Sequence, residues 1–319
     1  MMRNILRGAV MAALVIAAGP AFAADTLHVG KASPTSDVML PVDIGVKTGI
    51  FKKHGLDVAI ATFTGGGKLH QAMAAGAIDI GVGAGAELAL LARGAEEMAI
   101  CNAVGPAPFL GVGVGADSTA KTLDDLKGKR IGVSSNGSLT FWLSKELTRV
   151  KGWGPEGVTT VTTGNAAQNY IAALKTHEID AFISTTSLSL QLAEKGEGRL
   201  LAPVTSYTGN MAAGVIYATK KLIAEHPDDV RRFLAGWFET IDWMRHHKDE
   251  TVKMEAALTG FSPKVESEEY DLTIGMFSKD GKFDAQSLDT LKRSFADLKV
   301  LDSPPDMTKL YTEAFLPKK

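Results

Sequence analysis

Six short segments of the chain combine the residue types that bind a small molecule through hydrogen bonds. They are rich in Ser, Thr, Gly and Asn, and they span residues 33–37, 64–68, 83–87, 134–140, 163–168 and 184–187. Each follows a predicted strand and leads into a predicted helix, whose first turn presents unpaired backbone N–H groups and a partial positive charge. The same residue types also cap helices and form turns, which explains any one loop alone. Six such loops meeting at one cleft favour ligand binding.

The charges in these loops narrow the expected ligand class. Only Asp37, Lys68 and Glu87 are charged, and the six loops contain no Arg and no His. An arginine clamp on a dianion is therefore not expected. We expect a small organic anion, a sulfonate or carboxylate with an apolar part, held by N–H and hydroxyl donors. Four side chains beside the loops are candidates either for a wall of the site or for the core: Phe141, Trp142, Tyr207 and Met211.

No enzyme motif is complete in this sequence. The run Gly81-Val82-Gly83-Ala84-Gly85-Ala86 resembles a dinucleotide-binding fingerprint. It follows the third predicted strand rather than the first, however, and has alanine at the third glycine position. Residues 62–69 lack the first Gly and the Ser/Thr of a phosphate-binding loop. The seven His residues have no metal-binding spacing, and no nucleophile elbow occurs. We therefore predict no catalytic residue, no cofactor and no metal site.

The elements that must position these loops alternate between strand and helix as far as residue 203. Predicted strands at 27–31, 56–63, 78–82, 98–104, 109–114, 130–133, 158–162 and 179–183 are separated by helical stretches. This alternation is typical of an α/β fold with mostly parallel sheets. From residue 228 onward the pattern is almost wholly helical. A single apolar stripe runs through Val230, Phe233, Leu234, Trp237, Phe238, Ile241 and Met244.

A weak internal repeat divides the chain. Ile78-Asp79 and Ile179-Asp180 each open a strand after a helix, and Val29 and Ile131 lie in similar strands at nearly the same spacing. Two copies about 100 residues apart predict two lobes of one architecture rather than a solenoid. We expect residues 24–113 plus 212–319 to form lobe I and residues 114–211 to form lobe II. The two crossings, near 113–116 and 210–214, would form a hinge that closes on a ligand.

The N-terminus predicts export. Two basic residues in 1–7, an apolar run over 9–18 and Ala21-Phe22-Ala23 follow the order of a cleaved signal peptide over residues 1–23. The run is short for a membrane anchor, which is the alternative explanation. We expect a soluble periplasmic protein that begins at Ala24. Cys101, the only cysteine, excludes an intramolecular disulfide and is expected to be a buried thiol.

Composition limits the other partners. The chain is 45% hydrophobic and 22% charged, which suits compact cores, and its formal net charge is −2. A weakly acidic balance argues against binding to nucleic acid. We expect a monomer whose partners are a small molecule and a membrane component.

Three segments carry a family resemblance. Residues 49–58 (GIFKKHGLDV), 75–81 (AGAIDIG) and 123–133 (LDDLKGKRIGV) are similar to segments of the periplasmic solute-binding proteins for nitrate, taurine, alkanesulfonates and thiamine-precursor pyrimidines. The resemblance covers essentially the whole chain after residue 23. It implies a type II periplasmic binding-protein fold and delivery of the ligand to an ABC permease.

By the family pattern, ligand contacts come from the loops that follow the strands of each lobe. On this sequence those positions are Ser33, Ser36, Asp37, Gly65, Gly66, Gly85, Ala86, Ser135, Asn136, Ser138, Thr140, Asn165 and Thr185. The eukaryotic pyrimidine-synthesising relatives depend on a cysteine-rich motif, which a chain with only Cys101 does not contain. We therefore expect a binding protein rather than an enzyme. A periplasmic metabolic enzyme and a ligand-sensing module for a membrane receptor remain as alternatives.

Overall fold

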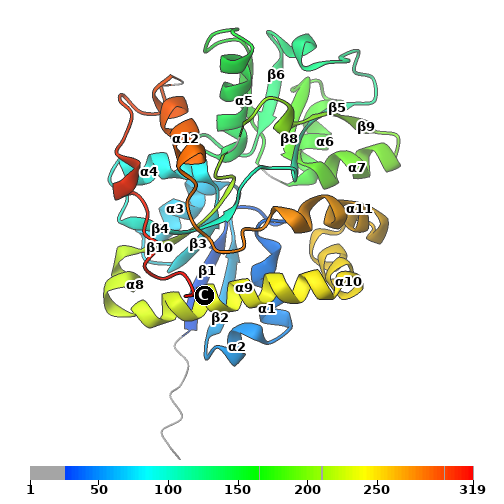
Figure 1. The fold of residues 1–319 in the computed structure, drawn as a ribbon. Coiled ribbons are helices and arrows are strands. Elements are labelled where there is room, and N and C mark those ends of the chain that lie inside the picture. Colours follow the sequence, from blue (N-terminus) through cyan, green and yellow to red (C-terminus); the bar gives the residue numbers. More distant parts are fainter. Residues whose placement is uncertain (1–25, 165, 210, 298, 319) are drawn as a thin grey trace, which may run out of the picture.

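A computed structural model describes residues 26–318 except 165, 210 and 298. The predicted signal peptide, its cleavage point before Ala24 and the predicted contact Asn165 lie outside the described residues. Among those residues, two five-stranded sheets lie one above the other in Figure 1, each flanked by helices. We call each sheet with its helices a lobe. The expected two-lobed α/β architecture is confirmed.

The first lobe contains a mixed sheet with the strand order β2-β1-β3-β10-β4. Strands β1 (Thr26–Lys31), β2 (Asp57–Thr62) and β3 (Ile80–Gly83) run parallel. Strand β10 (Gly214–Thr219) lies antiparallel between β3 and β4 (Glu97–Val104). The core of this lobe includes Cys101, which is fully buried as expected, and burial raises the pKa of its thiol.

The second lobe repeats this arrangement. Its strand order is β7-β6-β8-β5-β9, with β6 (Arg130–Val133), β7 (Thr159–Thr162) and β8 (Ala181–Thr185) parallel. Strand β5 (Leu110–Gly115) is antiparallel to both β8 and β9 (Gly198–Pro203). Val29 pairs with Ile80 in the first sheet, and Ile131 pairs with Ala181 in the second. The repeat read from the sequence is therefore a repeat of strand pairing.

The first crossing between lobes lies earlier than the sequence predicted. Strand β5 belongs to the second sheet, where Val112 pairs with Ile183 and Ala202, so the chain crosses between Val104 and Leu110 rather than at 113–116. The sequence of the apolar run 109–114 does not indicate which of the two sheets this strand joins. The second crossing lies between β9 and β10.

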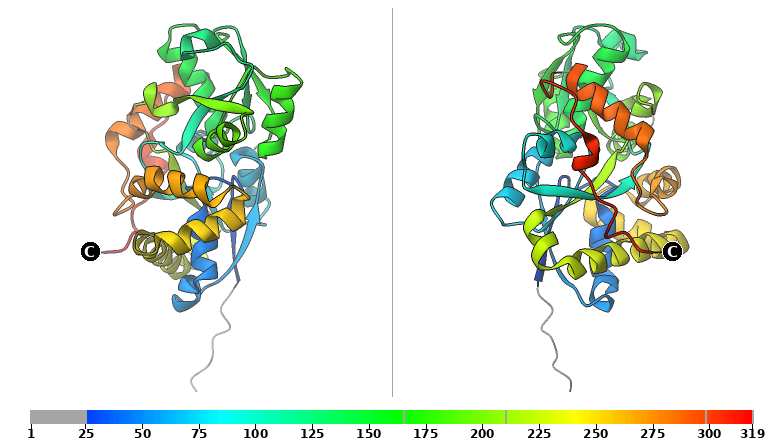
Figure 2. Two further views of the ribbon diagram at one scale, coloured as in Figure 1. Left: turned by 90° about the vertical axis from the view of Figure 1, so that its right-hand side faces the viewer. Right: turned by 60° about the vertical axis from the view of Figure 1, so that its left-hand side comes forward.

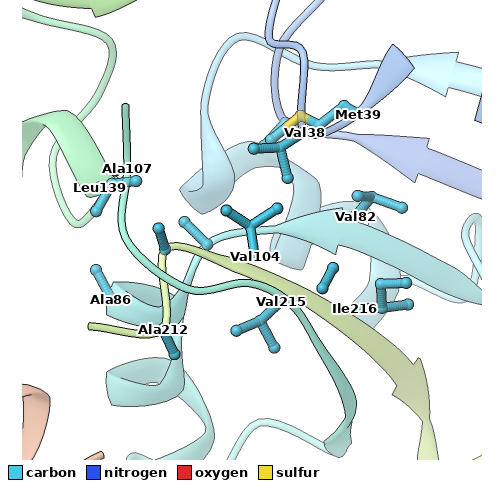
Figure 3. Packing of buried hydrophobic residues seen from close by; sticks show 14 of the residues in the cluster. Val38, Met39, Val82, Ala86, Val104, Ala107, Leu139, Ala212, Val215 and Ile216 are labelled. Carbon is cyan, nitrogen blue, oxygen red and sulfur yellow. The ribbon is translucent and has the colours of Figure 1, made fainter. Parts of the chain in front are cut away.

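The two crossings lie side by side. The Ala213 N–H donates to the carbonyl oxygens of Val104, at 2.9 Å, and of Gly105, at 3.2 Å. Figure 3 shows Ala107 and Ala212, both buried, on the two neighbouring crossing segments. Because both connections are short and adjacent, they form the natural axis for a rotation of one lobe against the other.

Helices cover both sheets. In the first lobe they are α1 (Leu40–Lys47), α2 (Ile50–Lys53), α3 (Gly66–Ala74), α4 (Leu88–Ala92), α8 (Lys220–Glu225), α9 (Pro227–His246), α10 (Lys248–Thr259), α11 (Pro263–Thr273) and α12 (Ala285–Asp297), with short 3₁₀ turns η1 (Gly85–Glu87), η4 (Ile274–Met276) and η5 (Met307–Lys309). In the second lobe they are α5 (Leu139–Val150), α6 (Ala167–Lys175) and α7 (Thr186–Glu194), with η2 (Leu123–Leu126) and η3 (Val204–Ser206). Within the described part of the chain, no helix is both long and apolar enough to cross a membrane.

Helix α9 buries the predicted apolar stripe against the first lobe. Phe233 stacks on Phe51 of α2 with ring centroids 5.2 Å apart, and the stripe residues Val230, Leu234, Trp237, Ile241 and Met244 are all buried. A 3.6-residue apolar period on a 20-residue helix produces this single buried face.

Helix α11 also contacts the second lobe (Figure 2). Phe261 and Val265 join the buried cluster around Phe182 and Leu188 of that lobe. The Ser262 hydroxyl donates to Glu194 Oε2 on α7 at 3.1 Å. Residues 212–319 were expected to belong to lobe I, and α11 of this segment also contacts α7 of the second lobe.

Candidate ligand-binding site

A cavity lies between the lobes, beyond the carboxyl ends of strands from both sheets. Ligands of open α/β sheets bind at this position. Its lining comes from the loops that follow β1, β2, β3, β6 and β8, from the two crossings, and from α6. The lining residues are Ala32, Ser33, Ser36, Val38, Met39, Gly65, Gly66, Gly83, Ala84, Glu87, Phe109, Leu110, Ser134, Ser138, Leu139, Thr140, Tyr170, Ser184, Thr185 and Ala213.

Seven of the positions predicted from the family pattern line this cavity: Ser33, Ser36, Gly65, Gly66, Ser138, Thr140 and Thr185. Ser135 does not line it but touches its edge, because a Cβ on Gly65 would come within 2.2 Å of Ser135 Oγ. The two lobes therefore come into close contact at Gly65 and Ser135. Whether any of these residues contacts a ligand remains a prediction.

Four other predicted positions lie away from the cavity lining. Gly85 is packed so closely that a Cβ would lie 1.9 Å from the Ala212 carbonyl oxygen, and Ala86 is buried beside it in η1. Asn136 is exposed at the surface and accepts a hydrogen bond from Thr162. The buried carboxyl of Asp37 contacts Glu269 on α11 instead of the cavity.

The hydroxyls of the second lobe hold their own loop together. Ser138 Oγ caps α5 by accepting from the Phe141 N–H at 3.3 Å, and it donates to the Ser135 carbonyl at 2.7 Å. Thr140 Oγ1 accepts from the Ser134 N–H at 2.9 Å. Both roles considered for these residues are therefore compatible: they cap a helix, and they face the cavity.

Glu87 is the only charged side chain in the lining that the structure describes, and it is 1% exposed. Its Oε2 accepts from the Ala84 N–H at 3.1 Å and lies 2.9 Å from His70 Nε2. The other ring nitrogen of His70 lies 2.5 Å from Glu97 Oε2 on β4. The ring of Tyr217 packs edge-on against His70, with centroids 4.9 Å apart, and its hydroxyl donates to the Ala84 carbonyl.

Two carboxylates set the charge state of His70. Burial disfavours the imidazolium, but hydrogen bonds and charge from Glu87 and Glu97 outweigh it and raise the pKa of His70 to about 9. At neutral pH both ring nitrogens therefore carry protons, and each donates to a glutamate. Since both nitrogens are occupied, this trio is held together by its own hydrogen bonds rather than arranged around a metal.

The walls of the cavity are apolar. They are formed by Val38, Met39, Phe109, Leu110, Leu139 and the ring of Tyr170. Tyr170 stacks at a tilt on Phe182, 5.2 Å between centroids, and burial raises the pKa of its phenol. The four wall candidates suggested by the sequence are not in the lining: Trp142, Tyr207 and Met211 are buried elsewhere, and Phe141 is half-buried under the ammonium of Lys145.

Sequence reasoning missed Tyr170 and undervalued Glu87. Tyr170 was placed in a predicted helix, where a buried tyrosine gives no separate signal. Glu87 was noted as a loop charge, but its partners His70 and Glu97 lie 17 and 10 residues away and meet it only in the folded chain. The glycines at positions 66 and 83 are explained by this carboxylate, because a Cβ on either would lie within about 2 Å of a Glu87 oxygen.

Two α/β lobes of matching topology, joined by two crossings around a cleft, define the periplasmic binding-protein fold. The chain belongs to the NMT1/THI5-like family, whose model matches residues 39–251. The resemblance read from the sequence is confirmed at this level.

Three comparisons place the chain among known proteins. The alkanesulfonate-binding protein SsuA of Xanthomonas axonopodis pv. citri, bound to MOPS, is similar in structure with a TM-score of 0.76; it is 19% identical, over 90% of this chain and 98% of that one. An inferred binding protein of Brucella abortus is 29% identical over 67% of this chain, a match that spans 65% of that protein's length. The yeast 4-amino-5-hydroxymethyl-2-methylpyrimidine phosphate synthase THI11 is 26% identical, over 87% of this chain and 84% of its own length.

Proposed function

We propose that this protein is the periplasmic substrate-binding component of an ABC importer, which captures one small molecule by closing its lobes. The observation that carries the proposal is the cavity between two lobes that are joined by adjacent crossings and meet at Gly65 and Ser135. A ligand that contacts both lobes binds the closed arrangement better than the open one, and only that difference can shift the equilibrium. A permease can then distinguish loaded from empty protein by shape.

The proposed ligand has an apolar body that fits the walls formed by Phe109, Leu139 and Tyr170. The organic anion expected from the sequence would place its charged group at the second lobe. There the hydroxyls of Ser138 and Thr140 lie at the start of α5, where backbone N–H groups and the helix dipole favour negative charge.

The test is to identify what the protein carries. Protein purified from the periplasm is denatured, and the released small molecules are identified by mass spectrometry. The identified molecule should be returned to emptied protein and should reduce the radius of gyration in small-angle scattering. At about 100 times its dissociation constant it should add roughly 2.7 kcal/mol to the free energy of unfolding. Absence of any small molecule that binds and compacts the protein would refute the proposal.

The yeast relatives supply a second candidate, a pyrimidine-synthesising enzyme. The single cysteine is the observation that weighs against it: Cys101 is fully buried on β4 and does not line the cavity. A binding protein returns its ligand unchanged, whereas an enzyme converts it. Incubation of the identified ligand with the protein, followed by mass spectrometry of the products, separates the two.

A further inference from the structure

Glu87, at the first-lobe end of the cavity that we call its floor, has one carboxylate oxygen without a hydrogen-bond donor. Glu87 uses Oε2 for both its hydrogen bonds, to the Ala84 N–H and to His70. Among the described residues, none donates to its Oε1, and this atom is not sealed in protein but borders the cavity. A carboxylate oxygen that is nearly buried and unpaired costs free energy unless a donor reaches it.

The same floor has more acidic than basic side chains. In the trio of Glu87, His70 and Glu97, two carboxyl groups flank a single imidazole. All three side chains are at most 4% exposed. Of the described residues that line the cavity, none is Lys, Arg or His. Lys31 on β1 is buried in the same lobe, but it does not line the cavity and is paired with Asp43 on α1.

Closure of the lobes makes this imbalance more costly. Expelling water from the cavity removes the solvent that screens Glu87 Oε1, and the cost of a buried unpaired charge rises as the surroundings become less polar. A ligand that supplies an N–H donor with positive charge removes the cost, whereas a ligand that places an anion there increases it. The floor therefore selects the ligand by both attraction and repulsion.

We propose that Glu87 is the specificity-determining residue of the cleft, and that its Oε1 binds a protonated nitrogen group of the ligand, such as an amine or an amidine. This inference rests on the proposed function and deepens it. The nitrogen group lies at the first-lobe end of the cavity, and the hydroxyls of Ser138 and Thr140 contact the other end of the ligand. Because the two ends come from different lobes, one bound molecule holds both lobes together.

Benzamidine and benzoate test the proposal directly. They share a planar ring that suits the apolar walls, and they differ in the charge and in the donors of the head group. The wild-type protein should bind benzamidine in calorimetry at millimolar concentration and should bind it at least tenfold more tightly than Glu87→Gln does. Benzoate should bind Glu87→Gln at least as well as the wild-type protein.

Glu97→Gln is the matched control. Both variants keep an acceptor for His70 and remove one negative charge from the same trio, but Glu97 lies behind the imidazole and does not line the cavity. A direct contact at Glu87 predicts less than a threefold loss of benzamidine affinity in Glu97→Gln. Equal losses in the two variants would mean that only net charge matters, and the proposed contact would be wrong.

A crystal structure of the wild-type protein with benzamidine makes the test independent of how the variants fold. The amidinium should lie within hydrogen-bond distance of Glu87 Oε1. No binding of benzamidine to the wild-type protein, or an amidinium placed elsewhere, overturns the inference. A released natural ligand that closes the lobes but has no N–H group also overturns it while leaving the proposed function intact.

Discussion

The carboxyl of Asp37, on the loop after β1, faces that of Glu269 on α11, and the contact holds only while one of them is protonated. Oδ2 of Asp37 and both oxygens of Glu269 are sealed from solvent, and the hydrogen bond between the two carboxyl groups needs a proton on one of them. Burial raises the pKa of Asp37 to about 6, while burial and the neighbouring Asp37 raise the pKa of Glu269 well above its usual range. Glu269 therefore carries the proton. The pair lies beside the cleft, where α11 also contacts the second lobe.

Two more glutamates make this region a pH-sensitive one. Burial, together with the charges of Asp37 and Glu266, raises the pKa of Glu255 to about 9. Burial also raises the pKa of Glu266 to about 7, even though the hydroxyl of Thr259 donates to its carboxylate. The folded protein keeps protons on these groups that the unfolded chain releases above its usual carboxyl pKa of about 4.

The protein should accordingly be most stable at mildly acidic pH. Between about pH 5 and pH 9 the folded state binds more protons than the unfolded state, so the free energy of unfolding falls as pH rises. His70 acts in the same direction, since its contribution is complete below about 6.5 and is lost as pH rises through about 9. Denaturant titrations at pH 5.5, 7 and 8.5 measure the slope. A constant or rising free energy of unfolding across that range would contradict these assignments.

Replacing Glu269 by glutamine should stabilise the protein at alkaline pH. The amide needs no proton, and its N–H group can donate to the Asp37 carboxylate, so the charge cost above pH 7 disappears. We expect Glu269→Gln to raise the melting temperature at pH 8.5 by about 2–4 °C, the equivalent of about 1 kcal/mol, and to change it little at pH 5.5. Glu268→Gln on the same helix is the control, because Glu268 is exposed. Equal shifts in both variants would point to surface charge instead of the buried pair.

Ser138 can be tested for its two roles separately. Ser138→Ala removes the cap of α5 and should lower the free energy of unfolding by about 1 kcal/mol. Thr219→Ala removes a similar cap from α8, where Thr219 Oγ1 accepts from the Leu222 N–H at 3.2 Å, outside the cavity lining. Both variants should lose comparable stability, but only Ser138→Ala should lose tenfold or more in affinity for the ligand identified from the purified protein. Unchanged affinity in Ser138→Ala would assign this serine to capping alone.

The sequence predicted the parts of the fold that depend on local pattern. The buried stripe of α9 and the repeat of strands around Val29 and Ile131 follow from periodicity and turn residues, which neighbouring residues determine. The assignment of β5 to the second sheet could not be predicted in the same way. A short apolar strand pairs equally well on either side of a hinge, and only its partners Ile183 and Ala202 decide which sheet it joins.

The residues of the candidate site likewise fall into those that the local pattern predicts and those that depend on distant parts of the chain. Ser33, Gly65, Ser138 and Thr185 were found because loops after parallel strands converge at one edge of a sheet. Glu87 was not recognised as the floor, because its environment depends on His70 from α3 and Glu97 from β4. Asp37 was assigned to the ligand because it lies in the first loop, but α11, more than 200 residues later in the chain, provides its partner.

Adjacent glycines at the start of α3 test the position of Glu87 without changing any charge. A Cβ on Gly66 would lie 1.8 Å from Glu87 Oε1 and 2.2 Å from its carboxyl carbon, and this carboxylate is held in place by His70 and the Ala84 N–H. Gly66→Ala should therefore displace Glu87, lower the free energy of unfolding by about 1–3 kcal/mol and abolish benzamidine binding.

Gly67→Ala is the matched control. A Cβ on Gly67 would lie 3.4 Å from the Asn136 carbonyl oxygen, and alanine is more favourable than glycine in a helix by about 1 kcal/mol. Gly67→Ala should thus keep or improve stability and keep benzamidine binding, as thermal melts and calorimetry on the two variants would show. If Gly66→Ala behaves like Gly67→Ala in both measurements, the carboxylate of Glu87 does not occupy the floor of the cavity as described.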